Sequence, residues 1–213
     1  MAKPRKVSNL LALAILGTLI QRPMHPYEMA SVIRARGKDA DMPIKWGSLY
    51  TIVKNLEKHG FIEATGSTRE GGRPERTVYR ITTAGNEELR DWVRELLATP
   101  EQEQSRFKAA LSMAGALTPG EAVDLLRQRV DRLSAELEAD RRTLAGQDVP
   151  RLFLIEDEYD LAIRAADLTW TRTLLDELAA GTFPGIDMWR QFHVTGEVPA
   201  ELRELVEKGR PDD

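Results

Sequence analysis

One short segment, residues 45–60, predicts a helix with two chemically different faces. Its apolar residues recur at the helical spacing i, i+3, i+4 and i+7: Leu49, Ile52, Val53 and Leu56. The other side carries hydroxyl, amide and ammonium groups: Tyr50, Thr51, Lys54, Asn55 and Lys58. Such groups can bond phosphate oxygens and base edges in a DNA major groove. An ordinary amphipathic surface helix shows the same pattern, so the interpretation as a recognition helix depends on the neighbouring segments.

Two further helices are predicted before this segment. Residues 9–22 (NLLALAILGTLIQR) are mostly apolar and end at Pro23, which lacks a backbone donor. The second helix starts with Pro26 at its first position, where the missing N–H costs nothing. Gly37 closes this helix as a left-handed cap. Three short helices in this order are typical of a helix-turn-helix core.

The basic residues ahead of the first helix, Lys3, Arg5 and Lys6, also suggest a signal peptide. However, no small-residue cleavage site follows, and the apolar run is shorter than the roughly 20 residues that span a bilayer. We therefore expect a cytoplasmic protein without a membrane partner. The basic residues are instead expected to form an arm that touches DNA phosphates.

After Gly60 the pattern becomes that of β-strands. Residues 61–65 and 75–82 are rich in β-branched and aromatic side chains. The turn formers between them (GSTREGGRP) include Arg69 and Arg73. The sequence therefore predicts a β-hairpin with a basic tip, which is the wing of a winged helix-turn-helix.

In this order, the segments resemble the PadR family of bacterial transcription regulators. The matching pieces lie within residues 10–97 and are LALAILGTL, HPYEM, GSLYTIVKNLEKHGFIEA, GGRPERTVYRITTAG and ELRDWVREL. The resemblance implies a winged helix-turn-helix that binds operator DNA as a homodimer. Members are usually repressors that a small molecule or a stress signal releases. Residues 43–45 are less typical of the family, so no base preference is carried over.

Charge is divided unevenly along the chain. Residues 1–85 contain 14 Lys and Arg against 7 Asp and Glu, a net charge of +7. Residues 86–213 contain 16 against 27, a net charge of −11, which leaves −4 for the whole chain. The cationic half favours phosphate contacts, whereas the acidic half would be repelled by DNA.

From residue 99 onward the pattern is helical. A short helix is predicted near residues 103–115, and Thr118 starts a capping box that opens a long helix. Two long helices carry apolar seams: Leu126, Val130, Leu133 and Leu137 in the first, and Ile163, Trp170 and Leu174 in the second. The seams can pair within one chain or between two chains, and the second arrangement gives a dimer. In longer members of the resembled family, the C-terminal helices serve dimerisation.

The last part of the chain is harder to interpret. Residues 183–192 hold a dense apolar cluster, and residues 199–208 suggest a terminal helix. The cluster could close an effector pocket or fold the tail back on the core, and we favour the tail because such clusters are commonly satellites of a core. Flat aromatic effectors would stack on tryptophan rings, but Trp92 and Trp170 also lie on apolar helical stripes.

Little in the chain favours an enzyme. It contains no cysteine, and His25, His59 and His193 lie far apart in the sequence. No serine stands in a nucleophile-elbow motif, and Gly71–Gly72 lacks the context of a phosphate-binding loop. The acidic run 156–160 suits the start of a helix better than a metal site. We therefore expect no catalytic residues, no metal and no cofactor.

The sequence as a whole predicts a mainly α fold. Residues 1–99 form a winged helix-turn-helix with three helices and a two-stranded wing, and residues 100–213 form a long-helix domain for dimerisation and an effector. We expect a sequence-specific transcriptional regulator, a homodimeric repressor of double-stranded operator DNA that responds to a small molecule or a stress signal. A small-molecule effector is expected to be aromatic or hydrophobic. The alternative is a winged-helix protein-interaction adaptor. The expected DNA contacts are Lys45, Ser48, Tyr50, Thr51, Lys54, Asn55, Arg69, Arg73, Tyr27 and Lys6.

Overall fold

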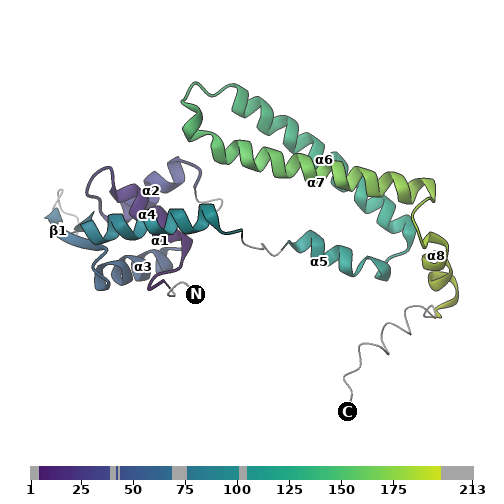
Figure 1. Ribbon diagram of the computed structural model, residues 1–213, viewed down its shortest axis with the longest axis horizontal. Helices are drawn as coiled ribbons and strands as arrows, with labels where there is room; N and C mark the ends of the chain where they lie inside the picture. Colours follow the sequence, from purple (N-terminus) through teal and green to yellow (C-terminus); the bar gives the residue numbers. More distant parts are fainter. Residues whose placement is uncertain (1–4, 39–41, 43, 69–75, 101–104, 198–213) are drawn as a thin grey trace, which may run out of the picture. The chain divides into compact units, whose positions relative to one another are not determined.

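The computed structural model describes residues 5–38, 42, 44–68, 76–100 and 105–197. The chain divides into two compact units, Met1–Gln102 and Glu103–Asp213, which we call the winged unit and the helical unit (Figure 1). The winged unit contains α1 (Leu10–Leu19), α2 (Pro26–Ala35), α3 (Trp46–Lys58), β1 (Ile62–Thr68), β2 (Arg76–Ile81) and α4 (Thr83–Ala98). The helical unit contains α5 (Arg106–Ser112), the 3-10 turn η1 (Ala114–Ala116), α6 (Pro119–Ala145), the 3-10 turn η2 (Arg151–Phe153), α7 (Ile155–Ala180) and α8 (Ile186–Thr195). The predicted mainly helical fold with a two-stranded wing is confirmed.

Helix α1 is the centre of the winged unit. It is apolar on most sides, and it contacts α2, α3, α4 and β2. Ala12, Ile15 and Leu16 have no exposed surface. A helix that is hydrophobic all round is stable only when other elements enclose it, so α1 brings the recognition helix and the wing together.

The wing is an antiparallel pair in which Ile62 lies opposite Ile81, with a bulge between Ala64 and Gly66. It is joined to α4 by a close approach of two backbones. A Cβ atom on Gly85 would lie 2.0 Å from the Phe61 carbonyl oxygen, so only glycine fits there. The Thr82 hydroxyl caps α4 by accepting from the Gly85 N–H, and it donates to the Gly60 carbonyl at 2.6 Å.

Two long helices, α6 and α7, lie side by side and form most of the helical unit (Figure 1). The predicted capping box at the start of α6 is present between Thr118 and Glu121. Leu137 of α6 is buried, as are Leu168 and Thr171 of α7. Ion pairs between the two helices flank this seam: Arg129 with Asp167, and Arg164 with Asp140.

Three details differ from the sequence analysis or lie outside what the structure describes. The short helix predicted near residues 103–115 covers only Arg106–Ser112 and continues as η1. Residues 186–195 form helix α8, which the sequence analysis did not predict. The terminal helix expected at residues 199–208 falls outside the described residues. Within the described ranges, no helix has the length and apolarity needed to cross a bilayer.

Candidate nucleic-acid interface

The two faces predicted for residues 45–60 are separated in α3 as expected. Leu49 and Leu56 have no exposed surface, and Val53 is 1% exposed. In contrast, the Tyr50 side chain is 52% exposed, and the other polar residues of the face are exposed as well: Ser48, Thr51, Lys54 and Asn55. Burial of one face fixes the orientation of the helix, and the polar face remains accessible to a duplex.

The structure adds one detail within α3 and one at its N-terminal cap. The Thr51 hydroxyl donates to the Gly47 carbonyl oxygen at 2.9 Å. Its proton is therefore in use, and only its lone pairs and its methyl group remain for a base. Lys45 is the N-cap residue of α3, and its side chain makes no capping hydrogen bond. The first N–H groups of α3 thus lack a side-chain acceptor at this cap.

A groove of about 320 Å³ lies between the start of α2, helix α3 and strand β2. Hydroxyl, imidazole and ammonium groups line it, including those of Tyr27, Tyr50 and Lys54. Tyr79 also lines the groove. Burial raises the pKa of the Tyr79 hydroxyl, and the Glu57 carboxylate raises it further. Tyr79 therefore stays protonated at neutral pH and acts as a donor.

An aromatic stack that the sequence analysis missed joins α2 to the start of α3. The rings of Tyr27 and Trp46 lie 5.4 Å apart at an interplanar angle of 8°. The Arg34 guanidinium lies 5.0 Å from the centre of the Trp46 ring. Stacking and cation–π contacts of this kind stabilise one arrangement of the two helices. Tyr27 is still 55% exposed, so its hydroxyl is free to approach DNA.

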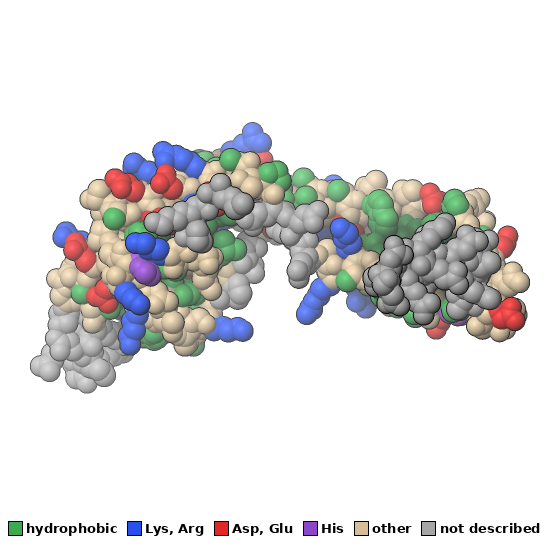
Figure 2. All heavy atoms as spheres, turned by 60° about the horizontal axis from the view of Figure 1, so that its bottom comes forward, with side chains coloured by type: hydrophobic (Ala, Val, Ile, Leu, Met, Phe, Trp, Pro, Cys, Tyr) green, Lys and Arg blue, Asp and Glu red, His purple; other side chains and the backbone are tan. Residues whose placement is uncertain are grey.

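The other basic residues predicted to contact DNA have different outcomes. Arg69 and Arg73 lie outside the described residues, as does Lys3. Lys6 is exposed, as a phosphate contact requires. For Arg5 the prediction of a free basic arm is wrong, because its guanidinium donates to Glu88 at 2.6 Å and to Glu95, and lies 5.2 Å from the Trp92 ring centre. Arg5 therefore holds the chain start against α4. Basic side chains still stand out over the winged unit in Figure 2.

The residues predicted for dimerisation fall into two groups. Leu126 and Leu137 of α6 are only 8% and 4% exposed within a single chain, and Val130 and Leu133 are half-buried. On α7, Ile163 is 55% and Trp170 50% exposed, whereas Leu174 is half-buried. The α6 seam is therefore largely used within one chain, and the outer stripe of α7 remains available to a second one.

Metal-ligand geometry is absent from the part of the chain that the structure describes, where no cluster of three or more His, Asp or Glu could hold an ion. The acidic residues predicted at a helix start do lie in the first turn of α7. One of them, Glu158, binds the Arg151 guanidinium, which lowers the pKa of the carboxyl group. This arrangement fits a structural role at a helix N-terminus.

Comparisons with known proteins agree with this geometry. The model of the transcriptional regulator PadR-like family matches residues 15–91. The negative transcriptional regulator PadR of Bacillus subtilis (strain 168) is 27% identical over 129 residues, which cover 61% of this chain and 70% of the relative.

Solved structures share the fold. Bacillus subtilis PadR in complex with operator DNA has a TM-score of 0.66 at 22% identity, covering 79% of this chain and 99% of that one. The same protein in complex with p-coumaric acid has a TM-score of 0.64 at 21% identity, covering 80% and 99%. A PadR-like regulator from Bacillus cereus has a TM-score of 0.53 at 18% identity, covering 83% and 99%. The family consists of transcriptional regulators, and its model matches most of the winged unit of this chain.

Proposed function

We propose that this protein is a homodimeric repressor that binds operator DNA through α3 and the wing. The observation that carries this proposal is the exposed polar face of α3, which lies opposite a fully buried apolar face. Tyr50, Thr51, Lys54 and Asn55 would enter the major groove, while Lys45 and Ser48 would hold phosphates near the helix start. Tyr27, Lys6, Arg69 and Arg73 would add contacts to the backbone or the minor groove.

The homodimer follows from the needs of a twofold operator. Two recognition helices must lie about one DNA turn apart, roughly 34 Å, and a rigid helical module can set that distance. The exposed apolar stripe of α7, with Tyr159 and Ile163, supports such a module. On this proposal the α7 stripes of two subunits pack together, because each would otherwise leave a large apolar surface in water.

A small aromatic molecule is the proposed signal. The complex of Bacillus subtilis PadR with p-coumaric acid supports this class of effector. An effector regulates only if its affinity differs between the DNA-bound and free arrangements of the dimer. Release of the operator would then require that the effector favour the arrangement that does not fit DNA.

The test begins with the DNA upstream of the protein's own gene, where footprinting with the purified protein identifies the protected site. Lys54→Ala should weaken binding to that site by about 1–3 kcal/mol, or roughly 5-fold to 150-fold, and flatten the salt dependence. Lys108→Ala is the matched control, since it removes the same charge from an exposed lysine of the helical unit. Its binding should remain that of the wild type.

Two outcomes would contradict the proposal. If Lys54→Ala binds DNA as well as the wild type, with an unchanged circular dichroism spectrum, the polar face of α3 is not the contact surface. If neither the protected site nor a random duplex is bound at low salt, the winged unit serves as a protein-interaction adaptor instead, because phosphate neutralisation predicts strong binding at low salt.

A further inference from the structure

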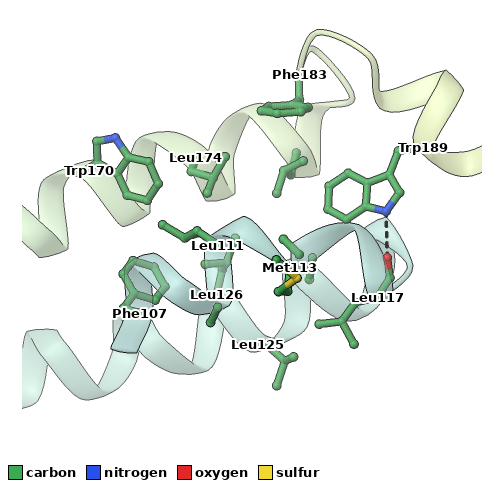
Figure 3. Close-up of a pocket in the computed structure, with 14 residues that line it drawn as sticks. Phe107, Leu111, Met113, Leu117, Leu125, Leu126, Trp170, Leu174, Phe183 and Trp189 are labelled. Carbon is green, nitrogen blue, oxygen red and sulfur yellow. Dashed lines mark hydrogen bonds between the residues drawn. The ribbon is translucent and has the colours of Figure 1, made fainter. Parts of the chain in front are cut away.

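The helical unit contains a cavity of about 370 Å³ whose lining is entirely hydrophobic. Residues of α5, α6, α7, α8 and the segments between them form its walls (Figure 3). At one end, the rings of Phe107 and Trp170 meet edge to face with centres 6.1 Å apart. At the other end, Phe183 and Trp189 meet in the same way at 6.4 Å. The size and the lining are those of small-molecule sites in proteins.

The side chains that line this cavity offer few polar groups, namely the indole N–H groups of Trp170 and Trp189. The indole N–H of Trp189 already donates to the Leu117 carbonyl oxygen at 2.8 Å (Figure 3). One cation touches the lining from outside: the Arg129 guanidinium lies 3.7 Å from the Phe107 ring centre, and it is paired with Asp167. A carboxylate placed among these side chains would therefore lose part of its water and gain no charged partner from the lining, which is unfavourable.

We propose that this cavity binds an uncharged, flat, apolar molecule of about two or three rings. Aromatic rings at both ends provide edges and faces for such a molecule. The absence of charged groups from the lining selects against anions, including phenolic acids in their ionised form. The ligand chemistry thus differs from that of a carboxylate effector.

Two short helices of the unit, α5 and α8, both contribute side chains to the cavity. Helix α5 has no buried residue, and its inward side chains Phe107 and Leu111 are cavity walls. Helix α8 is fastened to the α5–α6 connection by Trp189 and by His193, whose Nε2 lies 3.0 Å from the Gly115 carbonyl oxygen. A ligand would add contacts to both helices and favour their docked position.

The regulatory consequence rests on the proposed function. Helix α5 is the first described element after the winged unit along the chain. A ligand that adds contacts to α5 would therefore act on the described element of the helical unit that is nearest in sequence to the DNA-binding unit. The binding step itself depends on no DNA, so it is tested separately.

The test uses the full-length protein and a matched pair of fluorescent probes. N-phenyl-1-naphthylamine is neutral, and 8-anilinonaphthalene-1-sulfonate has the same aromatic scaffold with one negative charge. The neutral probe should bind at one site per chain, and the anionic probe at least about tenfold more weakly. Equal binding of both probes would overturn the proposal, because it would indicate ordinary exposed apolar surface.

Two substitutions on α5 locate the site. Ala110→Phe fills the cavity, since Ala110 belongs to its lining, and should weaken binding of the neutral probe at least about tenfold. Ala109→Phe adds the same ring at an exposed position outside the lining and should leave binding unchanged. Equal effects of the two variants would overturn the proposal. The proposal would also be overturned if the wild type binds no neutral probe and Ala110→Phe disrupts the dimer. In that case a second copy of the chain fills the cavity.

A measurement on the unaltered protein does not depend on how the variants fold. At a neutral-probe concentration ten times its Kd, the α5 amides should exchange with solvent about tenfold more slowly. The α1 amides, in the winged unit, should be unaffected. Unchanged exchange in α5 would overturn the proposal, whereas probe binding without any operator binding would contradict only the proposed repressor function.

Discussion

In the winged unit, a buried cluster drawn from α1, α2, α3, α4 and β1 is closed from water by the unit's own elements. In the helical unit, the buried cluster consists of Leu126, Leu178 and Ile186, and much larger side chains remain outside. Tyr159 is 64% and Phe153 67% exposed. Apolar burial is the main stabilising contribution in folding, and the winged unit has the larger buried cluster, whereas the helical unit leaves more of its large apolar side chains exposed.

This difference fits different roles for the two units. On the proposed function, the winged unit must hold α3 in one position when it binds DNA, and a closed core around α1 provides that rigidity. A unit that forms a dimer and binds an effector needs apolar surface that its own chain does not fully bury, such as the outer stripe of α7 and the cavity beneath α5.

The largest effect is expected in the winged core. Leu49→Ala removes a side chain with no exposed surface and should lower the free energy of unfolding of that unit by about 2–5 kcal/mol. Leu97→Ala is the control, because Leu97 of α4 is 84% exposed and its loss should change stability by less than about 0.5 kcal/mol. Urea denaturation, monitored by hydrogen exchange in α1 and α3, measures the change in unfolding free energy for each variant. Equal costs would mean that the winged core is not closed.

The next effect concerns assembly of the helical unit. Ile163→Glu places a carboxylate on the exposed stripe of α7 and should raise the dimer dissociation constant by about a hundredfold or more. The isolated subunit should keep its helical content, because Ile163 is 55% exposed there. Thr169→Glu adds the same charge on another exposed side of α7 and should leave the dimer intact. Sedimentation of Ile163→Glu as an unchanged dimer would place the interface elsewhere.

The sequence predicted the winged unit better than the helical unit for a physical reason. The boundaries of α2, α3 and α6 follow from local features: Pro26 at a first helical position, Gly60 after a last turn, and the Thr118 capping box. The apolar face of α3 follows from periodicity alone. Each of these signals lies within one element and can be read without knowing its neighbours.

Features that depend on contacts between distant residues escaped prediction. Helix α8 lies beyond Gly181 and Gly185, both at positive φ, and its Ile186 is buried against α6 and α7. The Tyr27–Trp46 stack also joins two elements. On α7 the predicted stripe includes Trp170, which is half exposed, whereas Thr171 faces the seam with α6. Periodicity finds apolar stripes, but it cannot say which side of an amphipathic helix a partner in the same chain will cover.

A smaller effect is expected at the start of the chain. Arg5→Ala removes hydrogen bonds to Glu88 and Glu95 and a contact with the Trp92 ring, and it should destabilise the winged unit by about 1–2 kcal/mol. Arg94→Ala is the control, because Arg94 is 73% exposed and its ion pair with Asp91 lies on the surface of the same helix. Thermal unfolding monitored at α4 distinguishes them. If Arg5→Ala instead weakens DNA binding without a change in stability, Arg5 belongs to a basic arm after all.

The smallest effect is a pH-dependent one at the start of α6. Thr118→Ala removes the N-cap and should cost the helical unit about 1 kcal/mol near neutral pH. The Thr118 hydroxyl and its backbone N–H both donate to the Glu121 carboxylate and lower its pKa. A carboxyl group with a lowered pKa in the folded state contributes stability that is present above its unfolded pKa and is lost as pH falls through the folded value. The loss of unfolding free energy caused by Thr118→Ala should therefore shrink in acid.

The control is Glu121→Gln, which keeps the shape of the side chain but cannot titrate. In this background, the loss of unfolding free energy caused by Thr118→Ala should no longer vary over that acid range. Urea denaturation at neutral and acid pH measures this for the wild type, the two single variants and the double variant. If the effect of Thr118→Ala does not change with pH even when Glu121 is present, the charge of Glu121 contributes nothing to the capping box.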